Sequence, residues 1–174
     1  MSSFSPNRVR RLARIPSFSP LIFRTMETHT PVSAILEHKQ AALHGVPPDA
    51  TVLEAVHLMN ENKIGAVLVM EEGKPVGIFT ERDVLVRVVD AGLDSAVTKV
   101  RDVMSKNLIV IKPTSTIEEA MRVVSEKRCR HLPVMNGDTV AGMISIGDLT
   151  RWIVREQDSY VENLLDYIYG HHQS

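Results

Sequence analysis

The chain has 174 residues, of which 44% are apolar and 24% charged, a balance typical of a soluble globular protein with one domain or two small lobes. Its apolar runs are much shorter than the ~18 residues of a membrane span, and one cysteine cannot form an internal disulfide, so an integral membrane protein and a disulfide-built secreted fold are excluded. Five of the 20 basic residues and none of the 21 acidic residues lie within residues 1–25, so the rest of the chain is acidic, which argues against nucleic-acid binding.

Residues 1–25 differ from the rest of the chain in composition. They are rich in Ser and Arg, and their prolines prevent a long helix. An Arg- and Ser-rich, acid-poor segment is typical of an organelle transit peptide, and a disordered extension ahead of a start at Met26 is the alternative. In both cases we expect the segment to lie outside the folded body. We expect a cytoplasmic protein, or one of an organelle matrix if the segment is a transit peptide.

An internal repeat organises the remaining chain. Residues 48–89 align with residues 113–154 at a constant offset of 65, without a gap. Chance rarely brings Pro, Thr, Glu, Gly and Asp into register together, so the chain carries two copies of one unit. The identities are Pro48 and Pro113, Thr51 and Thr116, Glu54 and Glu119, Ala55 and Ala120, Glu61 and Glu126, Val69 and Val134, Met70 and Met135, Gly77 and Gly142, Asp83 and Asp148, and Val89 and Val154.

Each copy begins with the pattern of a capped amphipathic helix. Thr51 and Glu54 have the spacing of a capping box, and apolar residues follow at i, i+3, i+4 and i+7. Thr116 and Glu119 repeat this pattern in the second copy. We therefore expect one helix with a single buried face at the start of each unit.

Two strands and a second helix complete the unit. The first strand is almost continuously apolar, which indicates burial on both faces, and an Asn-Gly turn in the second copy favours a hairpin. A short apolar leading segment precedes each unit, at residues 32–36 and 100–104. The expected elements are first strands over residues 64–70 and 129–135, turns over 71–74 and 136–138, second strands over 76–79 and 140–144, and helices that begin near Glu81 and Ile146.

These patterns predict an α/β (α+β) fold of two tandem repeats. A two-stranded sheet is marginal alone, so the copies are expected to pack on each other as a pseudo-twofold pair. The expected organisation is the extension over residues 1–25, repeats over 26–95 and 96–156, and a C-terminal amphipathic helix and tail over 157–174. Residues 160–169 carry apolar side chains on one face and would cover the pair or dock onto a partner.

The motif G-x-x-[ST]-x-x-D stands at the expected corner between second strand and second helix, over residues 77–83 and 142–148. One interpretation is structural, with the hydroxyl residue as N-cap and the aspartate as its partner. The other is functional. A helix N-terminus and a hydroxyl suit a phosphate, and the aspartate can accept both hydroxyls of a ribose diol.

Five motifs are informative together: Pro48-x-x-Thr51, Ile64-Gly-Ala-Val-Leu-Val, Gly77-Ile-Phe-Thr-Glu-Arg-Asp83, Arg130-His-Leu-Pro-Val134 and Gly142-Met-Ile-Ser-Ile-Gly-Asp148. Residues 32–154 resemble a cystathionine β-synthase (CBS) domain pair, or Bateman module. The resemblance implies two βαββα CBS repeats and two clefts that bind an adenosine-containing ligand: AMP, ADP, ATP, S-adenosylmethionine or NAD(H). It also implies an energy-sensing or other regulatory role without catalysis, no cofactor beyond that ligand, and a homodimer acting on an unidentified partner protein.

The resemblance further implies roles for individual positions. They are ribose binding for Asp83 and Asp148, hydroxyl contacts for Thr80 and Ser145, phosphate contacts for Arg82, Arg130, His131, Thr51 and Thr116, and a base pocket of Val46, Ile111, Gly65 and Ala66. Gly65 and Ala66 stand in repeat one where repeat two has its basic pair, and Gly147 replaces Arg82 in repeat two. The two clefts are therefore expected to differ.

Two other classes of function stay open, a small enzyme acting on an adenosyl substrate and a scaffold without ligand. The sequence offers no nucleophile–base pair, no second carboxylate spaced for a metal and no P-loop, and its histidines lack metal-ligand spacing. Cys129 is expected in a buried strand as an inert thiol. The apolar face of the helix over residues 81–90, together with residues 160–169, predicts a homodimer.

Overall fold

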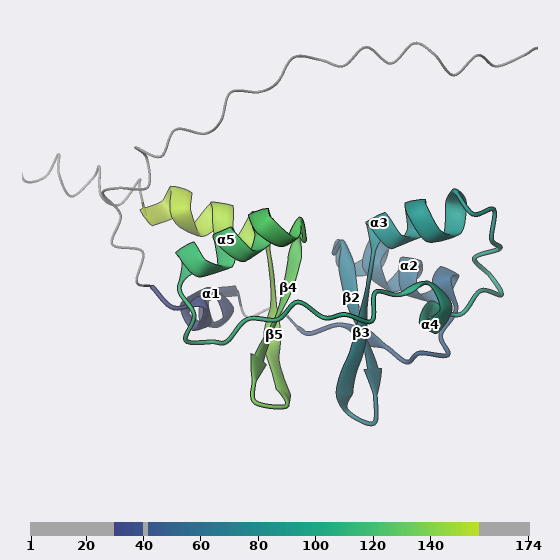
Figure 1. The fold of residues 1–174 in the computed structure, drawn as a ribbon, viewed down its shortest axis with the longest axis horizontal. Coiled ribbons are helices and arrows are strands. Elements are labelled where there is room, and N and C mark those ends of the chain that lie inside the picture. The colour runs from purple at the N-terminus through teal and green to yellow at the C-terminus, as the bar shows by residue number, and fades with distance from the viewer. Residues whose placement is uncertain (1–29, 40–41, 157–174) are drawn as a thin grey trace, which may run out of the picture.

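Two similar halves lie side by side in the computed structural model, which describes residues 30–39 and 42–156 (Figure 1). The extension expected over residues 1–25 and the stretch expected over 157–174 lie outside the described residues. Within the described part of the chain, no helix is long and apolar enough to cross a bilayer.

Repeat one builds a three-stranded sheet in the order β1-β2-β3. Strand β1 runs parallel to β2, and β2 and β3 form an antiparallel hairpin. The elements are β1 (Gly45–Val46), α2 (Val52–Asn62), β2 (Ala66–Glu71), β3 (Lys74–Thr80), α3 (Glu81–Asp83) and η1 (Val84–Val89).

Repeat two has the same plan with a shorter first strand. Ile111 forms a single parallel bridge with Val134 at the place where β1 pairs with β2 in repeat one. The hairpin registers shift at matching positions, after Val69 and after Val134, which are 65 residues apart. The elements are α5 (Ile117–Lys127), β4 (His131–Asn136), β5 (Thr139–Ser145) and a helix over residues 146–156. The structure thus confirms the α/β fold of two repeats.

The first helix of each repeat begins at the expected capping box. The Thr51 hydroxyl accepts from the Glu54 amide at 3.2 Å, and the Glu54 carboxylate accepts from the Thr51 amide at 2.7 Å. The Thr51 hydroxyl also donates to the Glu54 carboxylate at 3.0 Å, and the bonds from the amide and hydroxyl of Thr51 lower the pKa of Glu54. Thr116 and Glu119 make the same two capping-box bonds at 3.1 Å each.

The strands differ from expectation at their ends. Helices α2 and α5 both end at a residue in the left-handed region, Lys63 at φ 53° and Arg128 at φ 51°. Two further residues then pass before the chain pairs as a strand. Strands β2 and β4 therefore begin at Ala66 and His131, two residues later than expected. Cys129 consequently precedes β4 and is half-buried, which corrects its expected place in a buried strand.

The second helix of repeat one is also irregular. After one α-helical turn the chain widens into the π-helix η1, in which the Asp90 amide bonds to the Leu85 carbonyl at 3.0 Å. Val88 is buried, whereas Leu85 and Val89 are 63% and 64% exposed. The helix expected to begin near Glu81 is therefore present, and its π-helical part leaves the apolar side chains of Leu85 and Val89 on the surface, as expected for this face.

The two leading segments form helices, α1 (Val32–Lys39) and α4 (Val100–Val103), and each packs on the other repeat. Val32 and Ile35 of α1 belong to the core of repeat two, and Val100 and Val103 of α4 belong to the core of repeat one. Backbone bonds run reciprocally, from Val32 to Ser115 and from Val100 to Ala50, both at 2.8 Å. The hydrophobic cores therefore cross the repeat boundaries that the sequence suggests, 26–95 and 96–156.

Candidate functional site

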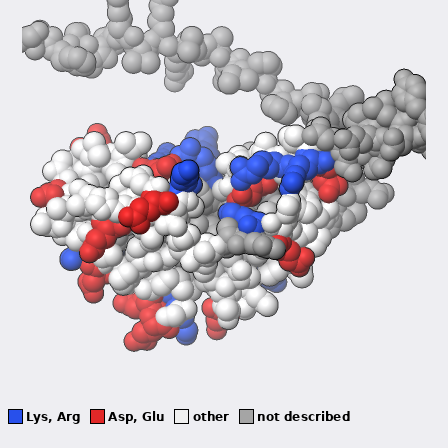
Figure 2. Space-filling model, turned by 180° about the vertical axis from the view of Figure 1, so that it is seen from behind, with Lys and Arg blue, Asp and Glu red and all other residues white. Residues whose placement is uncertain are grey.

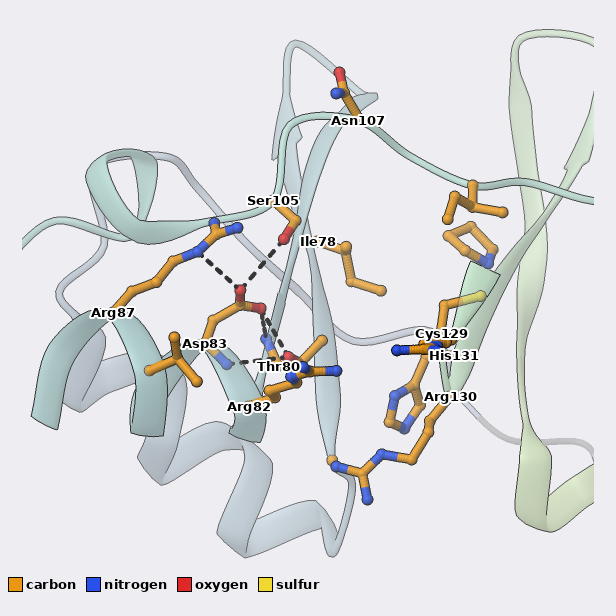
Figure 3. A pocket seen from close by; sticks show the side chains of 15 residues that line it. Ile78, Thr80, Arg82, Asp83, Arg87, Ser105, Asn107, Cys129, Arg130 and His131 are labelled. Carbon is orange, nitrogen blue, oxygen red and sulfur yellow. Dashed lines mark hydrogen bonds and ion pairs between the residues drawn. The ribbon is translucent and has the colours of Figure 1, made fainter. Parts of the chain in front are cut away.

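The motif of repeat one folds into a closed corner around Asp83, which is 7% exposed. One carboxylate oxygen accepts from the Thr80 amide at 3.0 Å and from its hydroxyl at 2.7 Å. The other oxygen accepts from the Ser105 hydroxyl at 3.2 Å and lies 3.4 Å from Nε of Arg87 (Figure 3). The expected N-cap role of Thr80 is confirmed. The Asp83 oxygen that contacts Ser105 and Arg87 is held by longer contacts than the oxygen that contacts Thr80.

The motif of repeat two forms the same corner with different neighbours. Asp148 accepts from the Ser145 amide and hydroxyl, both at 2.8 Å. It also meets Nζ of Lys39 at 2.9 Å and the guanidinium of Arg151 at 2.5 Å. Burial would raise the pKa of Asp148, but the hydrogen bonds from Lys39 and Ser145 outweigh it and leave this pKa lowered. Both oxygens of Asp148 are thus paired with a cation.

The motif glycines let the leading segments cross the second strands. A Cβ on Gly77 would lie 2.5 Å from Sδ of Met104, and a Cβ on Gly142 would lie 2.7 Å from Leu36. Both contacts are shorter than real Cβ atoms show, so a side chain at either glycine would displace the segment that crosses there. The close crossing also brings the chain after α4 beside Asp83.

The first cleft is a cavity of about 400 Å³ between the repeats. The corner at Asp83 forms one wall, and the chain leading into β4 forms the opposite wall (Figure 3). This volume lies within the usual range for a small-molecule site. The lining residues are Gly65, Ile78, Thr80, Arg82, Asp83, Val86, Arg87, Ser105, Asn107, Ile109, Arg128, Cys129, Arg130, His131 and Pro133.

The first cleft carries an excess of positive charge. Its described lining includes four arginines and one acid, Asp83, and guanidinium groups suit phosphate. Burial lowers the pKa of His131, and the charge of Arg130 lowers it further. Burial raises the pKa of the Cys129 thiol. Figure 2 shows basic side chains gathered beside a hollow near the upper edge of the rear face, with acidic side chains spread more widely.

The second cleft is also a cavity between the repeats, of about 540 Å³. Ser145 and Gly147 line it from the corner of repeat two, and Arg130 and His131 line it as well as the first cleft. Asp148 lines a separate groove between α1 and the helix over residues 146–156. The two corners therefore differ in the described residues: Asp83 lines the first cleft, whereas Asp148 lines the groove that adjoins the second.

The structure brings together six of the residues expected at the ligand: Thr80, Arg82, Asp83, Arg130, His131 and Gly65. It corrects the expected base pocket. Val46, Ala66 and Ile111 are 7%, 0% and 6% exposed, because their side chains are buried in the hydrophobic interior of the halves. Thr51 and Thr116 cap helices and line neither cleft.

Other lining residues were missed by sequence reasoning. Ser105, Asn107 and Ile109 reach the first cleft because α4 packs on repeat one, which no local pattern reveals. Arg87 lies four residues after Asp83, and that helical spacing could have identified it. Four apolar side chains of the lining are available to a flat base: Ile78, Val86, Ile109 and Pro133.

Comparisons with known proteins agree with this architecture. The CBS domain family model matches residues 42–90 and 100–155. "CBS domain-containing protein CBSX3, mitochondrial" of Arabidopsis thaliana is 34% identical over 150 residues, which are 81% of this chain and 73% of the relative. A solved CBS-domain containing protein from Agrobacterium tumefaciens is 36% identical, with a TM-score of 0.67 over 70% of this chain and 98% of that one. A CBS domain protein from Pyrobaculum aerophilum, complexed with AMP, shares the fold at 24% identity and a TM-score of 0.65, covering 75% and 99% of the two chains.

Proposed function

The chain belongs to the CBS domain family, whose tandem pairs are regulatory modules, and from this premise we propose that it binds an adenosine-containing nucleotide in the first cleft and passes the binding state to a partner protein. The proposed ligands are AMP, ADP or ATP, with S-adenosylmethionine and NAD(H) as alternatives. The protein acts as a regulator and does not turn the ligand over.

One observation carries the proposal: Asp83 and Arg130 line the same cavity from opposite repeats. Among the described residues, the outer oxygen of Asp83 has only the 3.2 Å bond from Ser105 and the 3.4 Å contact with Arg87, so the hydroxyls of a ribose can compete for it. Arg82 and Arg130 supply cations for phosphate. A nucleotide held at both ends would bridge the two repeats.

The neighbour solved with AMP supports the class of ligand, since a chain of this fold holds that nucleotide. The first cleft offers what AMP needs: a carboxylate for the diol, arginines for the phosphate and the apolar side chains of Ile78 and Ile109 for the base. Asp148, paired with Lys39 and Arg151, is a weaker ribose acceptor. We therefore assign the tighter site to the first cleft.

Location follows as a separate proposal. The protein is cytoplasmic, or resides in an organelle matrix if residues 1–25 act as a transit peptide. The mitochondrial name of the Arabidopsis relative supports the second alternative. Import of residues 1–25 fused to a fluorescent reporter distinguishes the two.

Titration calorimetry with AMP, ADP, ATP, S-adenosylmethionine and NAD(H) tests the nucleotide proposal. Asp83→Asn keeps the shape of the side chain but loses its charge and one acceptor, so it should weaken the best ligand by about 10- to 150-fold. Asp138→Asn, on the exposed turn between β4 and β5, is the matched control and should bind as the parent does. If Asp83→Asn melts and binds like the parent, the aspartate is only a helix cap.

A further inference from the structure

Arg130 and His131 serve both clefts. Each of the two residues lines the first cleft and the second cleft. His131 lies directly opposite Ser145 in the β4–β5 register, which places it beside the corner of repeat two. The same residue lies across the first cleft from Asp83 (Figure 3). The described chain therefore has one basic pair between two cavities.

Repeat one has no counterpart to this pair. Gly65 and Ala66 occupy the matching positions, and Ala66 lies opposite Thr80 as His131 lies opposite Ser145. A Cβ on Gly65 would lie 3.2 Å from Cε1 of the His131 ring. The His131 ring thus lies against Gly65, which occupies in repeat one the position of Arg130 in repeat two.

The second cleft depends on the shared pair more than the first does. Arg82, Arg87 and Arg128 line the first cleft in addition to the pair. Apart from the pair, the charged residues described in the second cleft are Lys63 and Glu81, whose charges offset each other. A phosphate in the second cleft would therefore rely on Arg130 and His131.

We propose that the clefts compete for Arg130 and His131, so that a phosphorylated nucleoside in the first cleft weakens the binding of another in the second. This inference rests on the proposed nucleotide function. A guanidinium that makes charge-assisted bonds to one phosphate cannot direct them to another, and two phosphates drawn to one pair repel each other. Because coupling between sites is reciprocal, each cleft weakens the other by the same factor.

Gly65→Arg tests the competition, because it supplies repeat one with the missing guanidinium. The contacts that its Cβ would meet are the ends of the Glu81 and His131 side chains, at 3.1 and 3.2 Å, which can shift. We expect calorimetry and native mass spectrometry with AMP to give one tight site per parent chain and two per variant chain. The second AMP should bind the variant about 10- to 150-fold more tightly than it binds the parent.

Thr139→Arg adds the same charge at an exposed position that lines neither cleft and should leave the stoichiometry at one. Gly65→Lys replaces Gly65→Arg if the latter fails to fold, as judged by its melting transition. Two AMP molecules bound to the parent with similar affinity would overturn the competition while the nucleotide function stands. One AMP per folded Gly65 variant would also overturn it. Absence of AMP binding in every chain would instead remove the proposed function, and the competition with it.

Discussion

The hydroxyl of Ser105 donates to the outer oxygen of Asp83 at 3.2 Å, which ties the chain between the repeats to the carboxylate of the first cleft. The backbone of Ser105 is fixed at the same point, because it exchanges bonds of 2.9 and 3.0 Å with Ile78 on β3. A ribose that takes this oxygen must displace or share the Ser105 hydroxyl. A nucleotide bound as proposed would therefore act directly on the segment that leads from α4 into repeat two.

Ser105→Ala separates the two uses of this oxygen. Without the hydroxyl the folded protein loses one hydrogen bond, so its free energy of unfolding should fall by about 1 kcal/mol. A ribose then competes only with the longer Arg87 contact at this oxygen of Asp83, and the affinity for AMP should rise by up to about fivefold. Calorimetry and thermal melts measure both effects, with Ser125→Ala on the exposed face of α5 as control. Weaker binding by Ser105→Ala would mean that the hydroxyl holds the ligand itself.

Lys39→Met should destabilise the protein in a pH-dependent way. Asp148 has a lowered pKa in the folded state, so the stability that its charge contributes is present above the ordinary value of 3.8 and is lost as the pH falls through the folded pKa. Removing Lys39 shrinks this contribution. We expect a loss of about 1 kcal/mol at pH 7 that disappears in acid, measured by urea unfolding. A constant difference at all pH values would assign the loss to packing, and Lys112→Met is the exposed control.

Much of the site could be predicted because its bonds are local. The links from Thr80 to Asp83 and from Ser145 to Asp148 join residues three apart, so a short motif is enough to specify them. The same holds for the helix that Thr51 caps. Such interactions form wherever the turn from strand to helix forms, and the motif that makes them occurs twice in the sequence.

The rest of the fold and of the site depends on which segments, distant in the sequence, pack against each other. Nothing in residues 32–36 indicates that α1 packs on repeat two, since both cores are aliphatic and accept the same side chains. The packing of α4 on repeat one puts Ser105 beside Asp83, and the packing of α1 on repeat two puts Lys39 beside Asp148. The expected base pocket is a related case: Val46 and Ile111 are apolar enough for a ligand, but each belongs to the hydrophobic core of its repeat.

The affinity for AMP should depend on pH through His131. The pKa of this ring is lowered in the free protein by burial and by Arg130, and a bound phosphate would raise it. Binding then takes up a proton, so the affinity should rise as the pH falls toward the lowered pKa and level off below it. His131→Gln removes this dependence and keeps any contribution from the titration of AMP itself. Identical pH profiles for the parent and His131→Gln would exclude the ring from phosphate binding.

Assembly through the helix η1 is the last prediction. Leu85 and Val89 on η1 are 63% and 64% exposed, and Leu93 and Val97, in the chain that follows, are 44% and 69% exposed. Exposed apolar side chains are typical of an interface when they form one patch, so we predict a homodimer that buries those of η1. Leu85→Glu would place a charge in that interface and should yield monomers in sedimentation equilibrium at micromolar concentration. Leu53→Glu, at a 38% exposed position on α2, should leave the dimer intact. A parent chain that sediments only as a monomer would contradict the predicted dimer.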